Sequence, residues 1–136
     1  MKFRFIIFLF LFISCGPQLE TLNQKKPYSA TGIAFVYNKN DFIEKVIKGK
    51  MNNDIMQISH QNLKTGTLIK VINPKNNESV TLKNIKRIKY PDFYKVLITK
   101  PVMNKLKLYE NLPIVEIIEI KKNKSFVAEK AKVYNE

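Results

Sequence analysis

Residues with strong chemical potential are few in this chain. The sequence holds one histidine, His60, and one cysteine, Cys15. A zinc cage within one chain needs several Cys or His ligands, and a disulfide needs a second Cys, so both are excluded. The four glycines form no phosphate-binding or dinucleotide-binding pattern. We therefore expect no metal and no other cofactor, and any proton transfer would have to involve His60 and nearby acidic or basic side chains.

Basic residues dominate the charge of the chain. Lys and Arg number 24 against 11 Asp and Glu, a formal net charge of +13, which is typical of proteins that bind nucleic acid or another anionic surface. Only Arg4 and Arg87 are arginine, however, and recognition of bases depends on the planar fork of arginine. Abundant Lys, Ile and Asn is also typical of A/T-rich coding, so we expect no nucleic-acid partner.

Residues 1–14 have the pattern of a secretory signal peptide. A basic start is followed by nine apolar residues, Phe5 to Ile13, which as a helix would rise only about 14 Å against a hydrocarbon core of roughly 30 Å. The segment ends in Phe-Ile-Ser-Cys-Gly, which resembles a bacterial lipobox. We expect Cys15 to become the lipidated first residue, with Gly16 matching the outer-membrane sorting pattern. The alternative is an ordinary cleaved signal that ends near a Cys.

The rest of the chain divides into a tether, one domain and a tail. Residues 15–27 contain the lipidated Cys and a stretch without sustained hydrophobic periodicity, so they are predicted to be a tether. Residues 28–122 are the predicted domain, which is long enough to bury a core without disulfides. Residues 123–136 mix apolar and charged side chains, and a terminal strand and a mobile tail are equally compatible with them.

Strand signals dominate the predicted domain. Six segments are apolar or alternating and are bounded by turn residues: 32–37, 55–59, 67–73, 79–83, 94–98 and 114–120. The turn cluster Pro74–Asn77 predicts a hairpin, and the largely apolar last segment predicts a central strand. Two short helices are expected, over 40–47 with an apolar face and after Thr99 as N-cap. Together these elements indicate a small, mainly β, closed barrel.

One block of the sequence resembles a known family. Residues 59–73 place a small residue before His60, then Leu63, the pair Gly66-Thr67 and a strand that ends Val-Ile-Asn. This arrangement resembles the rare lipoprotein A family. The likeness continues through three further segments and covers roughly residues 31–119: 76–80, 94–108 and 113–119.

The resemblance implies both a fold and a function. The fold would be a six-stranded double-psi β-barrel with one or two short helices. The protein would be a lipid-anchored envelope lipoprotein, in the outer membrane and facing the periplasm. Members of the family are lytic transglycosylases that act on peptidoglycan glycan strands stripped of stem peptides, and relatives such as the expansins loosen polysaccharide without hydrolysing it. Peptidoglycan glycan strands are therefore the expected partner.

The acidic residues of the family pattern are replaced in this chain. Cleavage of a glycan requires a proton donor and a base, usually carboxyl groups of tuned pKa. Aligned on the family pattern, the groove Asp falls on Lys86, an earlier Glu on Lys50 and a later Asp on Leu97, whereas Arg87 and His60 are kept. This substitution pattern favours loss of catalysis.

His60 and Asp92 remain as catalytic candidates. A lone His cannot replace a carboxylate pair, and the alternative for His60 is a hydrogen-bonded residue that supports the barrel. Asp92 lies in Lys89–Tyr94, a predicted loop at the groove, where it could stand in for the lost Asp. An Asp beside Pro is also common in turns for conformational reasons alone.

Four other side chains are candidates for a glycan groove: Lys86, Arg87, Tyr90 and Tyr94. The two basic residues, with Lys50 and Lys89, could attract an acidic glycan or lipid head groups, or they could form only a solvated basic face. The two tyrosines could stack on sugar rings or pack into the core.

Two classes of function follow. The first is an envelope barrel that binds peptidoglycan glycan strands or an envelope partner, with its catalytic acids lost. The alternative is a divergent endolytic peptidoglycan lytic transglycosylase that uses His60 with Asp92. A carboxylate hydrogen-bonded to His60 would favour the enzyme, whereas Lys86 beside it would favour the binding module.

The lipidation hypothesis predicts that Cys15 carries the acyl chains. Metabolic labelling with a fatty-acid analogue should mark the wild-type chain and spare Cys15→Ala, because no other cysteine is present. A Ser14→Thr variant that keeps the Cys serves as a control for expression and export. Labelling that persists in Cys15→Ala would rule the hypothesis out.

Overall fold

The computed structural model describes residues 25–122, so the predicted leader, Cys15, most of the tether and the tail lie outside the described residues. Within these residues eight elements follow one another: β1 (Ser29–Val36), α1 (Lys39–Ile43), β2 (Ile58–Ser59), β3 (Leu68–Ile72), β4 (Ser79–Lys83), β5 (Val96–Ile98), α2 (Lys100–Lys105) and β6 (Ile114–Ile120). All six predicted strands and both predicted helices are present; β4 and β6 have the predicted bounds, and the other elements differ from theirs.

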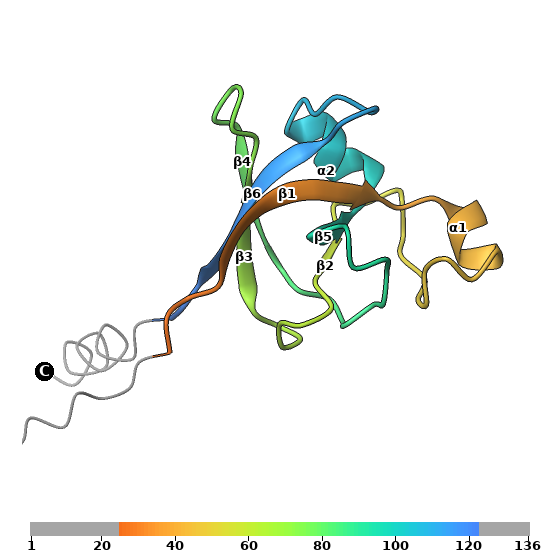
Figure 1. The fold of residues 1–136 in the computed structure, drawn as a ribbon, viewed down its shortest axis with the longest axis horizontal. Helices are drawn as coiled ribbons and strands as arrows, with labels where there is room; N and C mark the ends of the chain where they lie inside the picture. The colour runs from red at the N-terminus through yellow and green to blue at the C-terminus, as the bar shows by residue number, and fades with distance from the viewer. Residues whose placement is uncertain (1–24, 123–136) are drawn as a thin grey trace, which may run out of the picture.

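The strands form one strongly curved sheet in the order β2-β5-β1-β6-β3-β4 (Figure 1). β1 and β5 pair in parallel, and the other neighbouring strands are antiparallel. β6 lies between β1 and β3, which confirms the predicted central position of the last strand. The start of β1 and the end of β6 lie together at one end of the sheet, and α1 lies at the other end.

The two edge strands meet at one point, which nearly closes the sheet into a barrel. Ile58 of β2 forms a parallel bridge with Asn84, just after β4, and the Ile85 N–H donates to the Ile58 carbonyl at 3.1 Å. The prediction of a small, mainly β, six-stranded barrel with one or two short helices is confirmed. The barrel is compatible with the double-psi form.

Two apolar clusters fill the part of the chain that the structure describes. The larger lies inside the barrel and includes Ile58, Ile69, Val71, Val115 and Ile117, with Val102 and Leu106 covering it from α2 and the residue that follows. The second cluster lies under the loops beside β5. β5 serves both, because successive side chains of a strand point to opposite faces: Val96 and Ile98 join the first cluster and Leu97 the second.

The first predicted helix is shorter than expected, and its predicted apolar face is mostly exposed. α1 ends at Ile43 and the chain turns at Lys45, whose φ of 62° lies in the left-handed region. Phe42, Ile43 and Val46 therefore stay exposed, and only Ile47 reaches the second cluster. The helix predicted over 40–47 is therefore too long, because residues 44–47 form a turn and a bend in which the N–H groups of Val46 and Ile47 both donate to the Asp41 carbonyl, at 2.9 and 3.2 Å.

The second predicted strand is also shorter than expected. Residues 55–57 do not pair with a neighbouring strand, because the Thr99 side chain forms hydrogen bonds with their backbone. The Thr99 hydroxyl donates to the Ile55 carbonyl at 2.8 Å and accepts from the Gln57 N–H at 3.0 Å. Thr99 does precede α2 as predicted, but its side chain holds this loop and makes no capping bond to the helix.

Candidate functional site

The predicted site residues lie on two segments that meet where β2 approaches the end of β4, a place that we call the barrel seam. Residues 59–64 begin at the last residue of β2, and residues 84–95 connect β4 to β5. The Ser59 hydroxyl donates to the Lys86 carbonyl at 2.7 Å and accepts from the Ile88 N–H at 3.1 Å. This buried serine therefore fixes the path of the chain that carries Lys86 and Arg87.

Asn84 is the second clamp between these segments. Its side-chain oxygen accepts from the His60 N–H at 2.9 Å, and its amide nitrogen donates to the carbonyls of His60 at 3.1 Å and Leu63 at 2.8 Å. Asn84 is 1% exposed, so these bonds replace those that water would make. The position of His60 in the fold depends on this amide.

The His60 side chain is held by its own loop. Nδ1 lies 3.2 Å from the N–H groups of both Asn62 and Leu63, and it accepts from them. A nitrogen that accepts carries no proton, so this geometry assigns the ring proton of the neutral imidazole to Nε2. The Tyr28 ring packs edge-on against the imidazole at 4.7 Å between centroids.

The surroundings favour a neutral imidazole. Burial lowers the pKa of His60, and the Glu119 carboxylate opposes that shift only in part. Glu119 itself accepts a hydrogen bond from the Tyr28 N–H at 2.9 Å. Within residues 25–122 no carboxylate is hydrogen-bonded to His60, which agrees with the alternative interpretation of a residue that supports the barrel.

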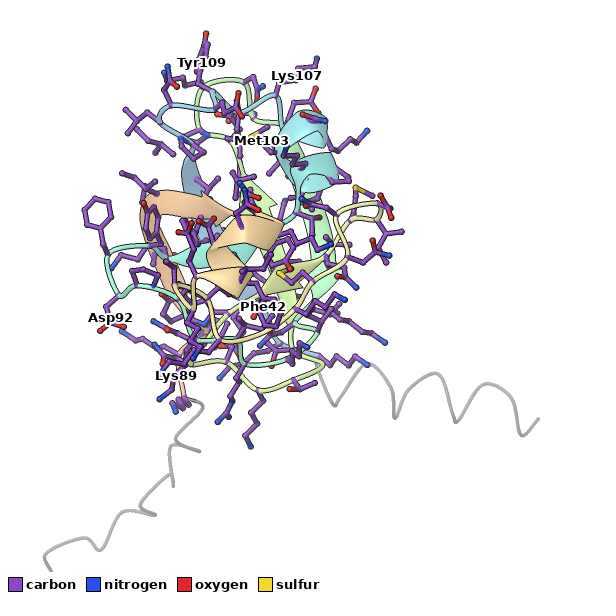
Figure 2. All side chains as sticks on the ribbon, turned by 90° about the vertical axis from the view of Figure 1, so that its right-hand side faces the viewer. Phe42, Lys89, Asp92, Met103, Lys107 and Tyr109 are labelled. Atoms are coloured by element: carbon purple, nitrogen blue, oxygen red, sulfur yellow. The ribbon has the colours of Figure 1, made fainter. Side chains whose placement is uncertain are left out.

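Asp92 borders the same small polar pocket as His60, a space of about 60 Å³. Its carboxylate accepts from the Gln61 side-chain amide at 3.1 Å, and it extends outward from the loop between β4 and β5 (Figure 2). The structure therefore brings the two catalytic candidates to one pocket without bonding them to each other.

Tyr90 packs inward at this pocket. Its ring belongs to the second apolar cluster and is 5% exposed. Its hydroxyl donates to the Lys95 carbonyl at 3.2 Å, and burial raises the pKa of Tyr90 to about 12. Of the two interpretations of Tyr90, packing into the core is therefore correct, and stacking of this ring on a sugar is wrong.

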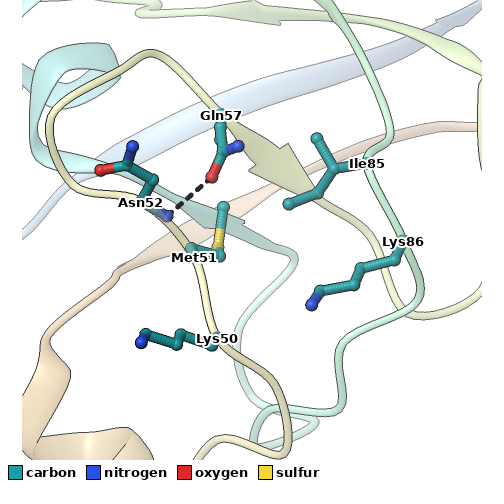
Figure 3. Close-up of a pocket in the computed structure, with 6 residues that line it drawn as sticks. All are labelled: Lys50, Met51, Asn52, Gln57, Ile85 and Lys86. Carbon is teal, nitrogen blue, oxygen red and sulfur yellow. Dashed lines mark hydrogen bonds between the residues drawn. The ribbon is translucent and has the colours of Figure 1, made fainter.

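Lys86 lies at a different and larger cavity, of about 520 Å³, which also contains Lys50. The two ammonium groups lie below Met51 in Figure 3, whereas Asn52 and Gln57 lie above it. The Gln57 side-chain oxygen accepts from the Asn52 N–H at 2.8 Å and shapes this wall. The cavity therefore combines two cations, two amides and the apolar side chains of Met51 and Ile85.

The remaining two candidates occupy separate places. The Arg87 guanidinium donates through Nε to the Leu63 carbonyl at 3.2 Å, so it braces the His60 loop from outside. Tyr94 is half-buried and its ring stacks at a tilt on Phe35, 4.5 Å between centroids. The predicted glycan groove is therefore divided: Lys86 lines one cavity, Tyr94 lines the His60 pocket, and Arg87 braces a loop.

Two comparisons with known proteins were without a match. No protein-family model matches this chain, and no curated protein sequence matches it. Over residues 25–122 the structure contains no group of three or more His, Cys, Asp or Glu side chains arranged to hold a metal ion. In the same range neither helix has the length and apolar character that a membrane crossing requires.

The lowered pKa of His60 predicts an acid-sensitive fold. A His whose pKa is lower in the folded than in the unfolded state stabilises the fold above the unfolded value, near 6.5, and that stability is lost as the pH falls. The free energy of unfolding of the full chain in mild detergent, measured by urea titration, should therefore decrease between pH 7.5 and 5.5, by at most about 1.4 kcal/mol per pH unit. His60→Asn should remove most of this slope, because the chain has no other His.

The matched control is Asp92→Asn, which leaves the imidazole and its two N–H donors in place and should keep the wild-type slope. A wild-type free energy of unfolding that stays flat or rises on acidification over this range would contradict the structural role assigned to His60.

Proposed function

We propose that this chain is a lipid-anchored protein of the bacterial cell envelope, similar to the rare lipoprotein A family, whose barrel binds peptidoglycan glycan strands without cleaving them. One observation carries the proposal: Lys50 and Lys86 line a single cavity, where the family pattern would place acidic residues. The anchor at Cys15 and an outer-membrane location are part of the same proposal and rest on the sequence of residues 1–16.

The chemistry of the cavity suits a glycan strand without stem peptides. Removal of the peptide leaves a free carboxylate on each muramic acid unit, and the exposed ammonium groups of Lys50 and Lys86 are complementary to it. The amides of Asn52 and Gln57 can exchange hydrogen bonds with acetamido groups, and Met51 with Ile85 offers an apolar surface to their methyls. Exposed ion pairs are weak individually, so we expect modest, salt-sensitive affinity.

The same residues argue against glycan cleavage. A lysine ammonium has an unperturbed pKa near 10.4, which makes it a poor donor of a proton to a glycosidic oxygen. Positive charge would also oppose the oxocarbenium-like transition state, which a carboxylate favours. His60 uses Nδ1 as an acceptor for two backbone N–H groups, so that nitrogen is not available as a base.

The second candidate function is a divergent lytic transglycosylase. The observation in its favour is that His60 and Asp92 border one pocket. The pocket is small, about 60 Å³, and the Asp92 carboxylate is engaged by Gln61. A lytic reaction forms an anhydro ring on the product sugar. At this site that reaction would require the side chains of Gln61 and Asp92 to rearrange.

A binding and turnover experiment separates the two functions. The full chain in mild detergent should retain peptide-free glycan strands in a pull-down, and mass spectrometry should find no anhydro-ended products. The double variant Lys50→Ala with Lys86→Ala should bind about ten-fold more weakly. Lys75→Ala with Lys105→Ala removes the same charge from exposed positions outside the cavity and should bind like the wild type.

Three outcomes would overturn the proposal. Equal weakening of glycan binding in both double variants would show that binding depends only on the net charge of the protein. A wild-type chain that retains no strands would end the binding proposal outright. Anhydro-ended products that disappear in Asp92→Asn, a variant on the surface that should fold normally, would show that the enzyme interpretation is right.

A further inference from the structure

A third pocket opens where β1 leaves its partner β6. Pairing between β1 and β6 ends at Ile33 and Ile114, whereas β1 continues beside β5 through Val36. The chain before β6 diverges at this point, held by a last bond from the Ala34 N–H to the Pro113 carbonyl at 2.9 Å. The space between β1 and the chain before β6 has a volume of about 430 Å³, and the first turn of α1 also borders it.

An exposed aromatic ring stands at the rim of this pocket. Phe93 is 69% exposed, the largest exposed fraction among the large apolar side chains of residues 25–122. It rests edge-on against Tyr94, 5.3 Å between centroids and 85° between planes, and Tyr94 in turn stacks on Phe35. The ring of Phe93 is thus supported from one side, while most of its surface remains free.

Two carboxylates share the pocket with these rings. Asp41 comes from α1 and Glu110 from the loop before β6. Neither forms a salt bridge with any described residue, although the chain is strongly basic; the single ion pair within residues 25–122 joins Lys107 to Glu78. Lys100 borders the pocket as well, so its three charged groups leave a local balance of one negative charge.

This combination fits a neutral sugar better than a cation. A cage for an ammonium group requires several free aromatic faces around one point, but Phe35 and Tyr94 stack on each other and only Phe93 is free. The net charge of +13 also repels cations at long range. Carboxylates that accept hydrogen bonds from hydroxyl groups, beside a flat apolar ring, match the two faces of a sugar.

We propose that this pocket is a second saccharide subsite, in which Phe93 stacks on a neutral N-acetylated sugar unit and Asp41 and Glu110 accept hydrogen bonds from its hydroxyl groups. The inference rests on the proposed function, and it adds residues that the family resemblance did not indicate. Tyr94 borders both this pocket and the His60 pocket, so a strand bound here would run across the loop between β4 and β5.

The test uses a ligand without carboxylates, the tetramer of N-acetylglucosamine, titrated into the full chain in mild detergent by calorimetry. Phe93→Ala should weaken its binding by about ten-fold or more, since the substitution removes the stacking face. Asp41→Asn with Glu110→Gln should weaken it by about five-fold. Tyr109→Ala removes another exposed aromatic ring, 67% exposed and outside this pocket, and should bind like the wild type.

The outcomes separate this subsite from the lysine cavity. Lys50→Ala with Lys86→Ala should leave binding of the neutral tetramer unchanged. Peptide-free strands that bind through the lysines while the tetramer fails to bind, or binds independently of Phe93, would overturn the subsite and leave the proposed function standing. Binding of spermidine that depends on Asp41 and Glu110, without binding of the tetramer, would identify a cation site and would also overturn the inference.

Discussion

The side-chain amide of Asn84 joins the two edges of the barrel where the backbone alone barely connects them. One bridge to Ile58 links β2 to the end of β4, and the amide adds bonds to both backbone groups of His60 and to the Leu63 carbonyl. A buried amide that lost these partners would cost about 1–3 kcal/mol for each unsatisfied group. The closed shape of the sheet and the path of residues 59–64 therefore depend strongly on this side chain, together with the Ser59 hydroxyl.

The residues that support the barrel therefore differ from the residues that are exposed at a cavity and free to contact a ligand. The His60 ring accepts hydrogen bonds from Asn62 and Leu63, and Ser59 fixes the backbone at Lys86. These buried polar groups of the seam are therefore hydrogen-bonded to other parts of the chain. The side chain of Lys86, in contrast, stays exposed at a cavity that it shares with Lys50. Cationic side chains on the outer face of this seam are what the proposed binding of an acidic polymer requires.

The strand pattern could be predicted from sequence because it depends on local alternation and turn residues. The failures have non-local causes: the left-handed turn at Lys45 ends α1, and the hydroxyl of Thr99, distant in sequence, takes the backbone groups of residues 55–57. His60 and Asp92 were placed at one pocket by prediction, but Asn84 was missed, because an Asn after a strand is ordinary until its partners are known. Burial of Tyr90 likewise depends on the second cluster, which no local pattern indicates.

The tautomer of His60 tests the central claim most directly, because the chain has one histidine and its ring nitrogens can be assigned without ambiguity. Long-range proton–nitrogen NMR of the full chain at pH 7 should show a neutral ring, protonated at Nε2 and unprotonated at Nδ1, and the same tautomer after peptide-free glycan strands are added. A ring protonated at Nδ1, or an imidazolium that forms when the glycan binds, would contradict the account, because either state would free His60 from its loop for proton transfer.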